Sequence, residues 1–247
     1  MEEAAAAGKK VVVLDRPNPL GMTVDGPVLD MSLRSGVGRL PIPVLHGMTL
    51  GELATMANDE GWLREGRSVD LTVVKCDGYT HASRYRLPVA PSPNLRDMTA
   101  IYLYPSLCLF EGTSASVGRG TDFPFKVYGH PAMKDRGFTF TPRSMAGAKN
   151  PPLLGRRCNG VDLRRSDSDS LIAKGVDLSY VIDAYNAMPA VARHKFFTPF
   201  FDKLIGNRKV RRMIADGVTA EEIKASWAGE VAQFKTLRKK YLLYPES

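Results

Sequence analysis

The chain has 247 residues, of which 44% are hydrophobic and 24% charged, a composition typical of a globular protein with one large or two small domains. It carries 34 Lys and Arg residues against 26 Asp and Glu residues, and the net charge of +8 either favours an anionic partner or merely keeps the protein soluble. The chain has no run of about 18 apolar residues and no signal-peptide pattern, so we expect neither a membrane-spanning helix nor a targeting signal.

An alanine-rich helix that ends near Gly8 is followed by a short apolar strand at residues 11–15. A continuous apolar strand is usually buried on both faces between parallel neighbours. Thr49 and Glu52 then match the capping box of an amphipathic helix, which leads into a second strand at residues 71–76. This order of strand, helix and strand predicts an α/β unit.

The proline-rich stretch 85–94 predicts a boundary between domains, which we place between residues 91 and 92. Beyond it we expect a strand at residues 100–104, a short helix that begins at Pro105, a glycine-rich loop and several short strands. The C-terminal third is predicted to be helical. Its second capping box and its apolar stripe, which we assign to the core, comprise Thr219, Glu222, Ile223, Trp227, Val231, Phe234 and Tyr241.

The three cysteines, Cys76, Cys108 and Cys158, are far apart and lack CxxC spacing. This pattern favours neither a metal site nor a disulfide framework, so we expect three buried or half-buried thiols, no metal and no cofactor. The basic residues are spread over separate segments, chiefly RRCNGVDLRR, GNRKVRR and KTLRKK, without interleaved aromatic residues or a recognisable reading helix. Nucleic-acid binding is therefore the least favoured function.

Polar residues follow the first strand and precede the capped helix. Asp15, Arg16 and Asn18 stand at the carboxyl end of the strand, where open α/β sheets usually form their ligand crevice. The alternative to a ligand-binding role is a structural one, in which these residues form an Asx-type turn and Arg16 pairs with a neighbouring residue. His46 lies close to a helix N-terminus, which disfavours the charged imidazole, although a lone histidine is more often structural.

Glu111 and Arg119 flank the glycine-rich loop, which lacks the spacing of a phosphate-binding P-loop and of a dinucleotide fingerprint. A carboxylate and a guanidinium group in this position can bind a polar, acidic ligand. An ion pair that braces the loop is an equal alternative. Asn94 stands at the expected domain boundary, where its amide suits sugar hydroxyl or N-acetyl groups, unless it is a simple turn residue.

Eight motifs together resemble, in the same order, those of the NamZ-type exo-β-N-acetylmuramidase family. They are VVVLDRPNPLG, DGPVLD, IPVLHGMTLGELA, LTVV, APSPN, YPSLCLFEGTSASVGRGT, PFKVYGHP and RCNGVDL. The resemblance implies an α/β fold, with the remnant of a Rossmann-like domain at residues 1–91 and a smaller mixed α+β domain with a helical C-terminus at 92–247. It also implies release of non-reducing terminal N-acetylmuramic acid from peptidoglycan fragments.

By position, the resemblance implies a catalytic role for Glu111. It implies substrate binding by Asp15, Arg16, Asn18, His46, Asn94, Arg119 and Thr121. The lactyl ether of muramic acid carries a carboxylate, which Arg16 or Arg119 could bind with two hydrogen bonds.

The family's front section, with a Pro-Glu-His-Gly motif whose glutamate looks catalytic, has no counterpart in this chain. We therefore expect that the chain begins inside the first domain, is N-terminally truncated and is less active than a full-length form. The alternative is a non-catalytic fragment that binds muropeptides or a partner domain. The resemblance also implies a bacterial periplasmic or secreted location for the full-length protein.

Overall fold

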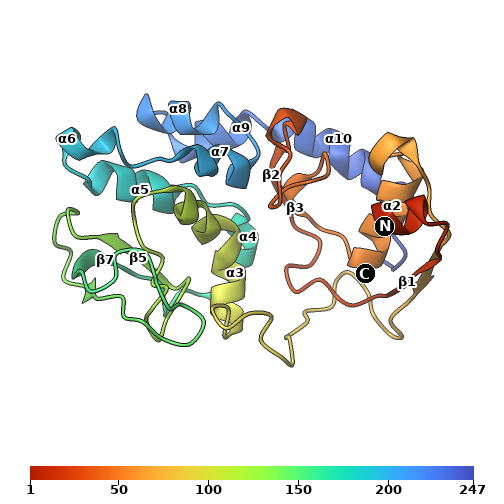
Figure 1. Ribbon diagram of the computed structural model, residues 1–247, viewed down its shortest axis with the longest axis horizontal. Helices are drawn as coiled ribbons and strands as arrows, with labels where there is room; N and C mark the ends of the chain where they lie inside the picture. The colour runs from red at the N-terminus through yellow and green to blue at the C-terminus, as the bar shows by residue number, and fades with distance from the viewer.

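The computed structural model describes all 247 residues and shows an α/β chain with ten α-helices and seven short strands (Figure 1). The helices are α1 (Glu2–Ala6), α2 (Leu50–Asp59), α3 (Met98–Leu107), α4 (Ser168–Lys174), α5 (Ser179–Ala187), α6 (Ala190–Arg193), α7 (Pro199–Ile205), α8 (Val210–Ala215), α9 (Ala220–Ala225) and α10 (Ala228–Arg238). The strands are β1 (Val11–Leu14), β2 (Val24–Val28), β3 (Pro43–His46), β4 (Leu71–Val74), β5 (Val127–His130), β6 (Thr139–Phe140) and β7 (Cys158–Asp162).

The N-terminal part contains the predicted strand, helix and strand. Strands β1 and β4 pair in parallel, with Val11 opposite Leu71, and the capping box at the start of α2 is present. The expectation that β1 is buried on both faces is wrong, because Val12 and Leu14 are 53% and 76% exposed. Helix α2 contacts both strands, and the alternate side chains point to the other, uncovered face.

An antiparallel hairpin of β2 and β3 lies beside α10, and the buried carboxylate of Asp25 connects it to the C-terminal half of the chain. This carboxylate accepts hydrogen bonds from the indole Nε1 of Trp227 at 3.0 Å and from the amide of Val176 at 2.9 Å. Its ion pair with Lys224 Nζ is 2.6 Å long. A buried carboxylate with this many donors is fully satisfied, so we assign it a structural role.

The second part combines a small antiparallel sheet, in the order β5, β7, β6, with helices α3 to α9. The predicted strand at residues 100–104 is wrong, because these residues lie within α3. The carboxylate of Asp97 caps this helix by accepting from the amide of Ala100, and the helix buries Ala100, Leu103 and Leu107 in the main core. A β-like composition was therefore overridden by the cap and by packing.

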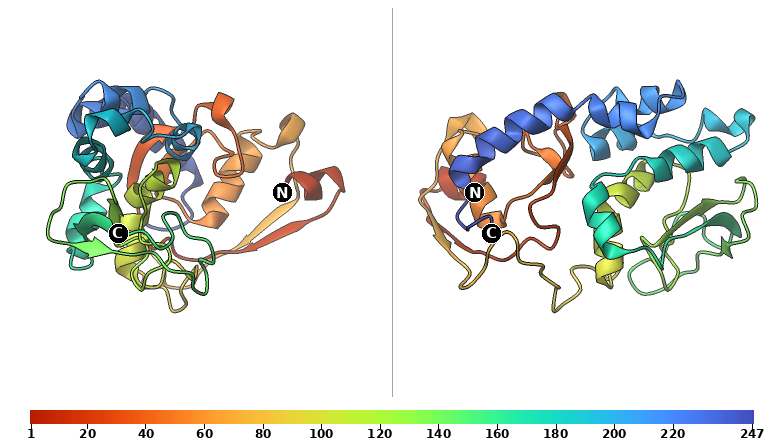
Figure 2. Two further views of the ribbon diagram at one scale, coloured as in Figure 1. Left: turned by 60° about the vertical axis from the view of Figure 1, so that its left-hand side comes forward. Right: turned by 180° about the vertical axis from the view of Figure 1, so that it is seen from behind.

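The C-terminal third is helical as predicted, and its capping box of Thr219 and Glu222 is present. The apolar stripe from Ile223 to Tyr241 is buried in the main core, which confirms that assignment. Helix α10 runs from the helices of the second part back to the N-terminal part, so that the end of the chain lies against α2 (Figure 2). None of the helices is both long and apolar enough to cross a membrane.

The three cysteines are free thiols, as expected. Cys108 and Cys158 are buried and Cys76 is half-buried. Burial raises the pKa of the Cys108 thiol to about 12 and that of Cys158 to about 11, so both remain protonated at neutral pH.

Candidate functional site

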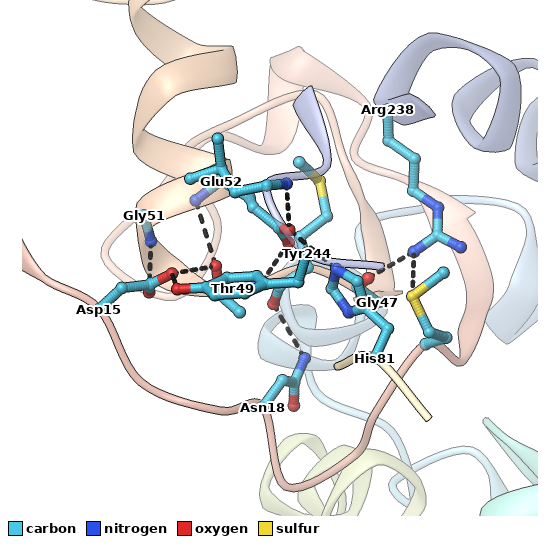
Figure 3. Close-up of polar contacts among 12 residues, drawn as sticks. Asp15, Asn18, Gly47, Thr49, Gly51, Glu52, His81, Arg238 and Tyr244 are labelled. Atoms are coloured by element: carbon cyan, nitrogen blue, oxygen red, sulfur yellow. Dashed lines mark hydrogen bonds and ion pairs between the residues drawn. The ribbon is translucent and has the colours of Figure 1, made fainter. Parts of the chain in front are cut away.

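The carboxylate of Asp15 joins the end of β1 to the start of α2 (Figure 3). It accepts hydrogen bonds from Thr49 Oγ1 at 2.6 Å, from the amide of Gly51 at 2.8 Å and from the Tyr244 hydroxyl at 2.7 Å. A side chain at Gly51 would clash, since its Cβ would lie 2.8 Å from Asp15 Cγ and 2.5 Å from Val73 Cγ1. The carboxylate therefore acts as an additional cap of the helix and is occupied by protein donors.

Asn18 forms the Asx-type turn that was one of the two sequence interpretations. Its Oδ1 accepts from the amide of Leu20 at 2.9 Å, and its Nδ2 donates to the carbonyl of Met48 at 3.0 Å. Arg16 is exposed and has neither a hydrogen-bond partner nor an ion-pair partner in the structure, in contrast to the local pairing considered above. Its guanidinium group is therefore free to bind a ligand.

His46 is held as a neutral imidazole at the end of β3. Burial, with a smaller contribution from the charge of Arg238, lowers its pKa from 6.5 to about 4. Its Nδ1 accepts from the amide of Met48 at 3.2 Å, which places the ring proton on Nε2. The neutral form is favoured, as the sequence suggested, but the cause is burial and Arg238 rather than the helix N-terminus, and Nε2 is left to donate to a ligand.

Arg16, Asn18 and His46 line one cavity of about 570 Å³. Its remaining wall is mostly apolar and comes from Leu87, Val89, Ala90, Pro91, Leu95, Ile101 and Tyr104, together with Pro17, Pro19, Leu20, Met48, Thr49 and Leu50. We call this space the central cavity. An apolar wall with a few convergent polar groups is typical of a small-molecule site, and here the polar groups are a free guanidinium, an amide and a neutral imidazole.

Glu111 and Arg119 are brought together, as the sequence suggested, but not at the central cavity. Arg119 donates from Nη2 to Glu111 Oε1 at 2.8 Å and from Nε at 3.0 Å, and it lies over the ring of Phe125 at 4.9 Å. Glu111 lines a separate cavity of about 630 Å³, and Tyr104 lines both cavities. Glu111 therefore lines a different cavity from Arg16 and His46, next to Tyr104.

Two further residues expected at the site are hydrogen-bonded to backbone carbonyls elsewhere. Asn94 is buried and donates from Nδ2 to the carbonyl of Gly147 at 3.0 Å. Thr121 is buried and donates from Oγ1 to the carbonyl of Gly118 at 2.6 Å. Neither residue lines the central cavity, and both connect loop segments.

The C-terminal residues 238–245 form a strap across the N-terminal part, which sequence reasoning missed. Arg238 donates from Nη1 to the carbonyl of Gly47, directly after His46. The Tyr244 hydroxyl donates to Asp15 and accepts from the amide of Cys76 at 3.1 Å. Burial, reinforced by Asp15, raises the pKa of Tyr244, so its hydroxyl stays protonated as a donor. The strap therefore contacts both segments that supply polar groups to the central cavity, the one that follows β1 and the one at the end of β3.

Glu52 and His81 form a buried pair under this strap (Figure 3). His81 Nε2 lies 2.8 Å from Glu52 Oε1, which also accepts from the amide of Leu243 at 2.7 Å. The capping box was a sequence signal for Glu52, but nothing in the sequence linked it to His81 or Leu243. These contacts join residues 29 and 191 positions apart, beyond the reach of local patterns.

The family model described as "Exo-beta-N-acetylmuramidase NamZ, N-terminal" matches residues 1–99, and the model for the C-terminal part of the same family matches residues 102–244. The chain belongs to the NamZ family. The peptidoglycan beta-N-acetylmuramidase NamZ of Bacillus subtilis (strain 168) is 37% identical over 260 residues. That match covers 99% of this chain but only 62% of the relative, so the chain spans less than two thirds of its length.

Two crystal structures of DUF1343 family proteins from Bacteroides fragilis NCTC 9343 have the same fold. The first has a TM-score of 0.96 at 55% identity, and the match covers 100% of this chain and 69% of the Bacteroides chain. The second has a TM-score of 0.81 at 24% identity, covering 99% and 68%, and supports the fold alone. The NamZ assignment thus rests on sequence, and the structural relatives support the architecture.

Proposed function

We propose that this NamZ-family chain binds the terminal N-acetylmuramic acid of peptidoglycan fragments in its central cavity and acts as a glycosidase that releases this sugar. The observation that carries the proposal is the free guanidinium group of Arg16 beside the neutral His46 in that cavity. Arg16 pairs with the lactyl carboxylate, which distinguishes muramic acid from N-acetylglucosamine. The amide of Asn18 and the Nε2 proton of His46 serve sugar oxygens. Peptidoglycan lies outside the cytoplasm, so we propose a periplasmic or secreted setting.

The β1, α2 and β4 elements support a Rossmann-like description of the first part, because a parallel strand pair is joined by a segment that contains a helix contacting both strands. We propose that residues 1–91 belong to this domain and residues 92–247 to the second. Both domains contribute to the central cavity, the second through Leu95, Ile101 and Tyr104.

A second candidate, binding without hydrolysis, is favoured by the lining of the central cavity. Glycoside hydrolysis usually needs a carboxylic acid next to the leaving oxygen, and no Asp or Glu lines this cavity. Asp15 is occupied by Thr49, Gly51 and Tyr244, and Glu111 lines a different cavity. A catalytic role for Glu111 stays a prediction, next to the alternative that its pair with Arg119 braces the loop.

Incubation of the chain with a chromogenic MurNAc-GlcNAc substrate separates these candidates. Release of free N-acetylmuramic acid that Arg16→Ala slows about tenfold or more supports the glycosidase. Saturable binding of the disaccharide without release supports the binding function. If the chain neither cleaves nor binds the disaccharide, both proposals are wrong.

A further inference from the structure

One segment of the chain is strongly basic. Residues 193–212 contain seven Lys and Arg residues and a single acidic residue, Asp202, a net charge of +6 against +8 for the whole chain. The segment runs from the end of α6 through α7 into α8 (Figure 1). These residues are neighbours in the sequence, and the fold brings Arg193 together with Arg208, Arg211 and Arg212.

Four arginines and a histidine of this segment surround one cavity of about 410 Å³. Its lining consists of Arg193, His194, Phe197, Arg208, Arg211, Arg212, Ala215 and Tyr185. We call it the arginine cavity. It shares no lining residue with the central cavity, so the function proposed above does not account for it.

The arginine side chains are positioned but not neutralised. Arg193 donates to the carbonyls of Met188 and Asn186 and lies over the ring of Tyr185 at 5.4 Å, an arrangement that fixes its guanidinium plane. Arg208 contacts only the hydroxyl of Ser32, at 3.4 Å. Neither arginine has a carboxylate within ion-pair distance.

The other two arginines each have one carboxylate partner. Arg211 makes two hydrogen bonds to Asp202, at 3.0 and 2.8 Å, and Arg212 lies 3.5 Å from Asp216. Arg193 and Arg208 therefore make no ion pair, although Arg208 is close enough to Asp30 for its charge to help lower the pKa of that carboxylate. Because guanidinium groups bind phosphate with two parallel hydrogen bonds, a doubly charged phosphate group matches both the charge and the donors of the cavity.

We propose that the arginine cavity is a binding site for a ligand that carries a phosphate monoester or free phosphate. A single carboxylate would pair with only one of the two guanidinium groups that make no ion pair. A long polyanion such as duplex DNA would need a continuous track rather than one cavity of this size.

Isothermal titration calorimetry with inorganic phosphate, in a phosphate-free buffer of low ionic strength, tests the site. We expect phosphate to bind the wild-type chain and Arg208→Ala to weaken binding about tenfold or more, the loss typical of a hydrogen bond to a charged group. Arg157→Ala removes the same charge from an exposed position outside the cavity and is the matched control. It should change the affinity by less than about twofold.

Acetate and duplex DNA serve as competing probes, and thermal melts verify that both variants fold. Acetate should bind at least about tenfold more weakly than phosphate, because it carries half the charge. The proposal is overturned if wild type does not bind phosphate or if acetate binds equally well. It is also overturned if Arg157→Ala weakens phosphate or DNA binding as much as Arg208→Ala, since diffuse surface charge would then explain the result.

Discussion

His46 is the residue whose ionisation links the central cavity to stability. Its pKa is about 4 in the folded chain and near 6.5 in the unfolded chain, so the unfolded chain binds the additional proton. The stability contribution is complete above pH 6.5 and is lost as the pH falls from 6.5 towards 4. When the pH is lowered from 7 to 5, we expect the titration of His46 to reduce the free energy of unfolding by about 2 kcal/mol.

Urea unfolding of wild type and of His46→Gln at pH 7 and pH 5 measures this contribution. The free energy of unfolding of His46→Gln should fall much less between pH 7 and pH 5, because glutamine does not titrate. His130→Gln is the control, since burial also lowers the pKa of His130 but this side chain is only half-buried and lies outside the central cavity. An equal pH dependence in wild type and His46→Gln would contradict the assignment of a neutral, buried His46.

Arg119 tests whether its pair with Glu111 acts on ligand or on fold. The pair is 29% and 27% exposed, and Arg119 also lies over Phe125, so we expect Arg119→Ala to lower the free energy of unfolding by about 1 to 2 kcal/mol. Binding of MurNAc-GlcNAc should stay within about twofold, because neither residue of the pair lines the central cavity. Weaker ligand binding with unchanged stability would restore the substrate-binding role implied by the family resemblance.

Elements with strong local signals could be predicted from the sequence. The capping boxes located the starts of α2 and α9 to the residue, and the β-branched run located β1. The interval 100–104 was misassigned because its composition suits a strand, whereas the Asp97 cap and burial favour a helix. Arg16 and Asn18 were identified because they follow a strand, and His46 because it precedes the Thr49 cap of a helix. Asn94 bonds to Gly147, 53 positions away, a tertiary contact that no local pattern predicts, whereas Thr121 bonds to Gly118 within its own loop.

The C-terminal strap could not be predicted, because its partners are distant in sequence. Tyr244 contacts Asp15 and Cys76, which precede it by 229 and 168 positions. Tyr244→Phe removes both hydrogen bonds while keeping the ring, so we expect the free energy of unfolding to fall by about 1 to 3 kcal/mol. Denaturant unfolding measures this change.

Tyr180→Phe is the matched control, since the Tyr180 hydroxyl has no hydrogen-bond partner in the structure. Its effect should stay within about 0.5 kcal/mol. The strap would have no stabilising role if both variants unfolded at the same denaturant concentration as wild type.

At the scale of the whole molecule, the uncovered face of the β1 and β4 sheet exposes Leu14 at 76% and Val74 at 48%. A short sheet with an apolar face and free edges promotes association between chains. We expect size-exclusion chromatography with light scattering to show a mass that rises with concentration above 27.1 kDa. Leu14→Lys should reduce it, whereas Val191→Lys, at an isolated exposed site, should not. A constant 27.1 kDa mass at all concentrations would contradict this expectation.

The central claim, that Arg16 recognises the lactyl carboxylate of muramic acid in the central cavity, is tested most directly by calorimetric titration with two disaccharides. One is MurNAc-GlcNAc and the other is GlcNAc-GlcNAc, which lacks the carboxylate. Arg16→Ala should weaken binding of the first by about 1.5 to 3 kcal/mol and leave binding of the second nearly unchanged. Equal weakening of both ligands, or of neither, would contradict the claim.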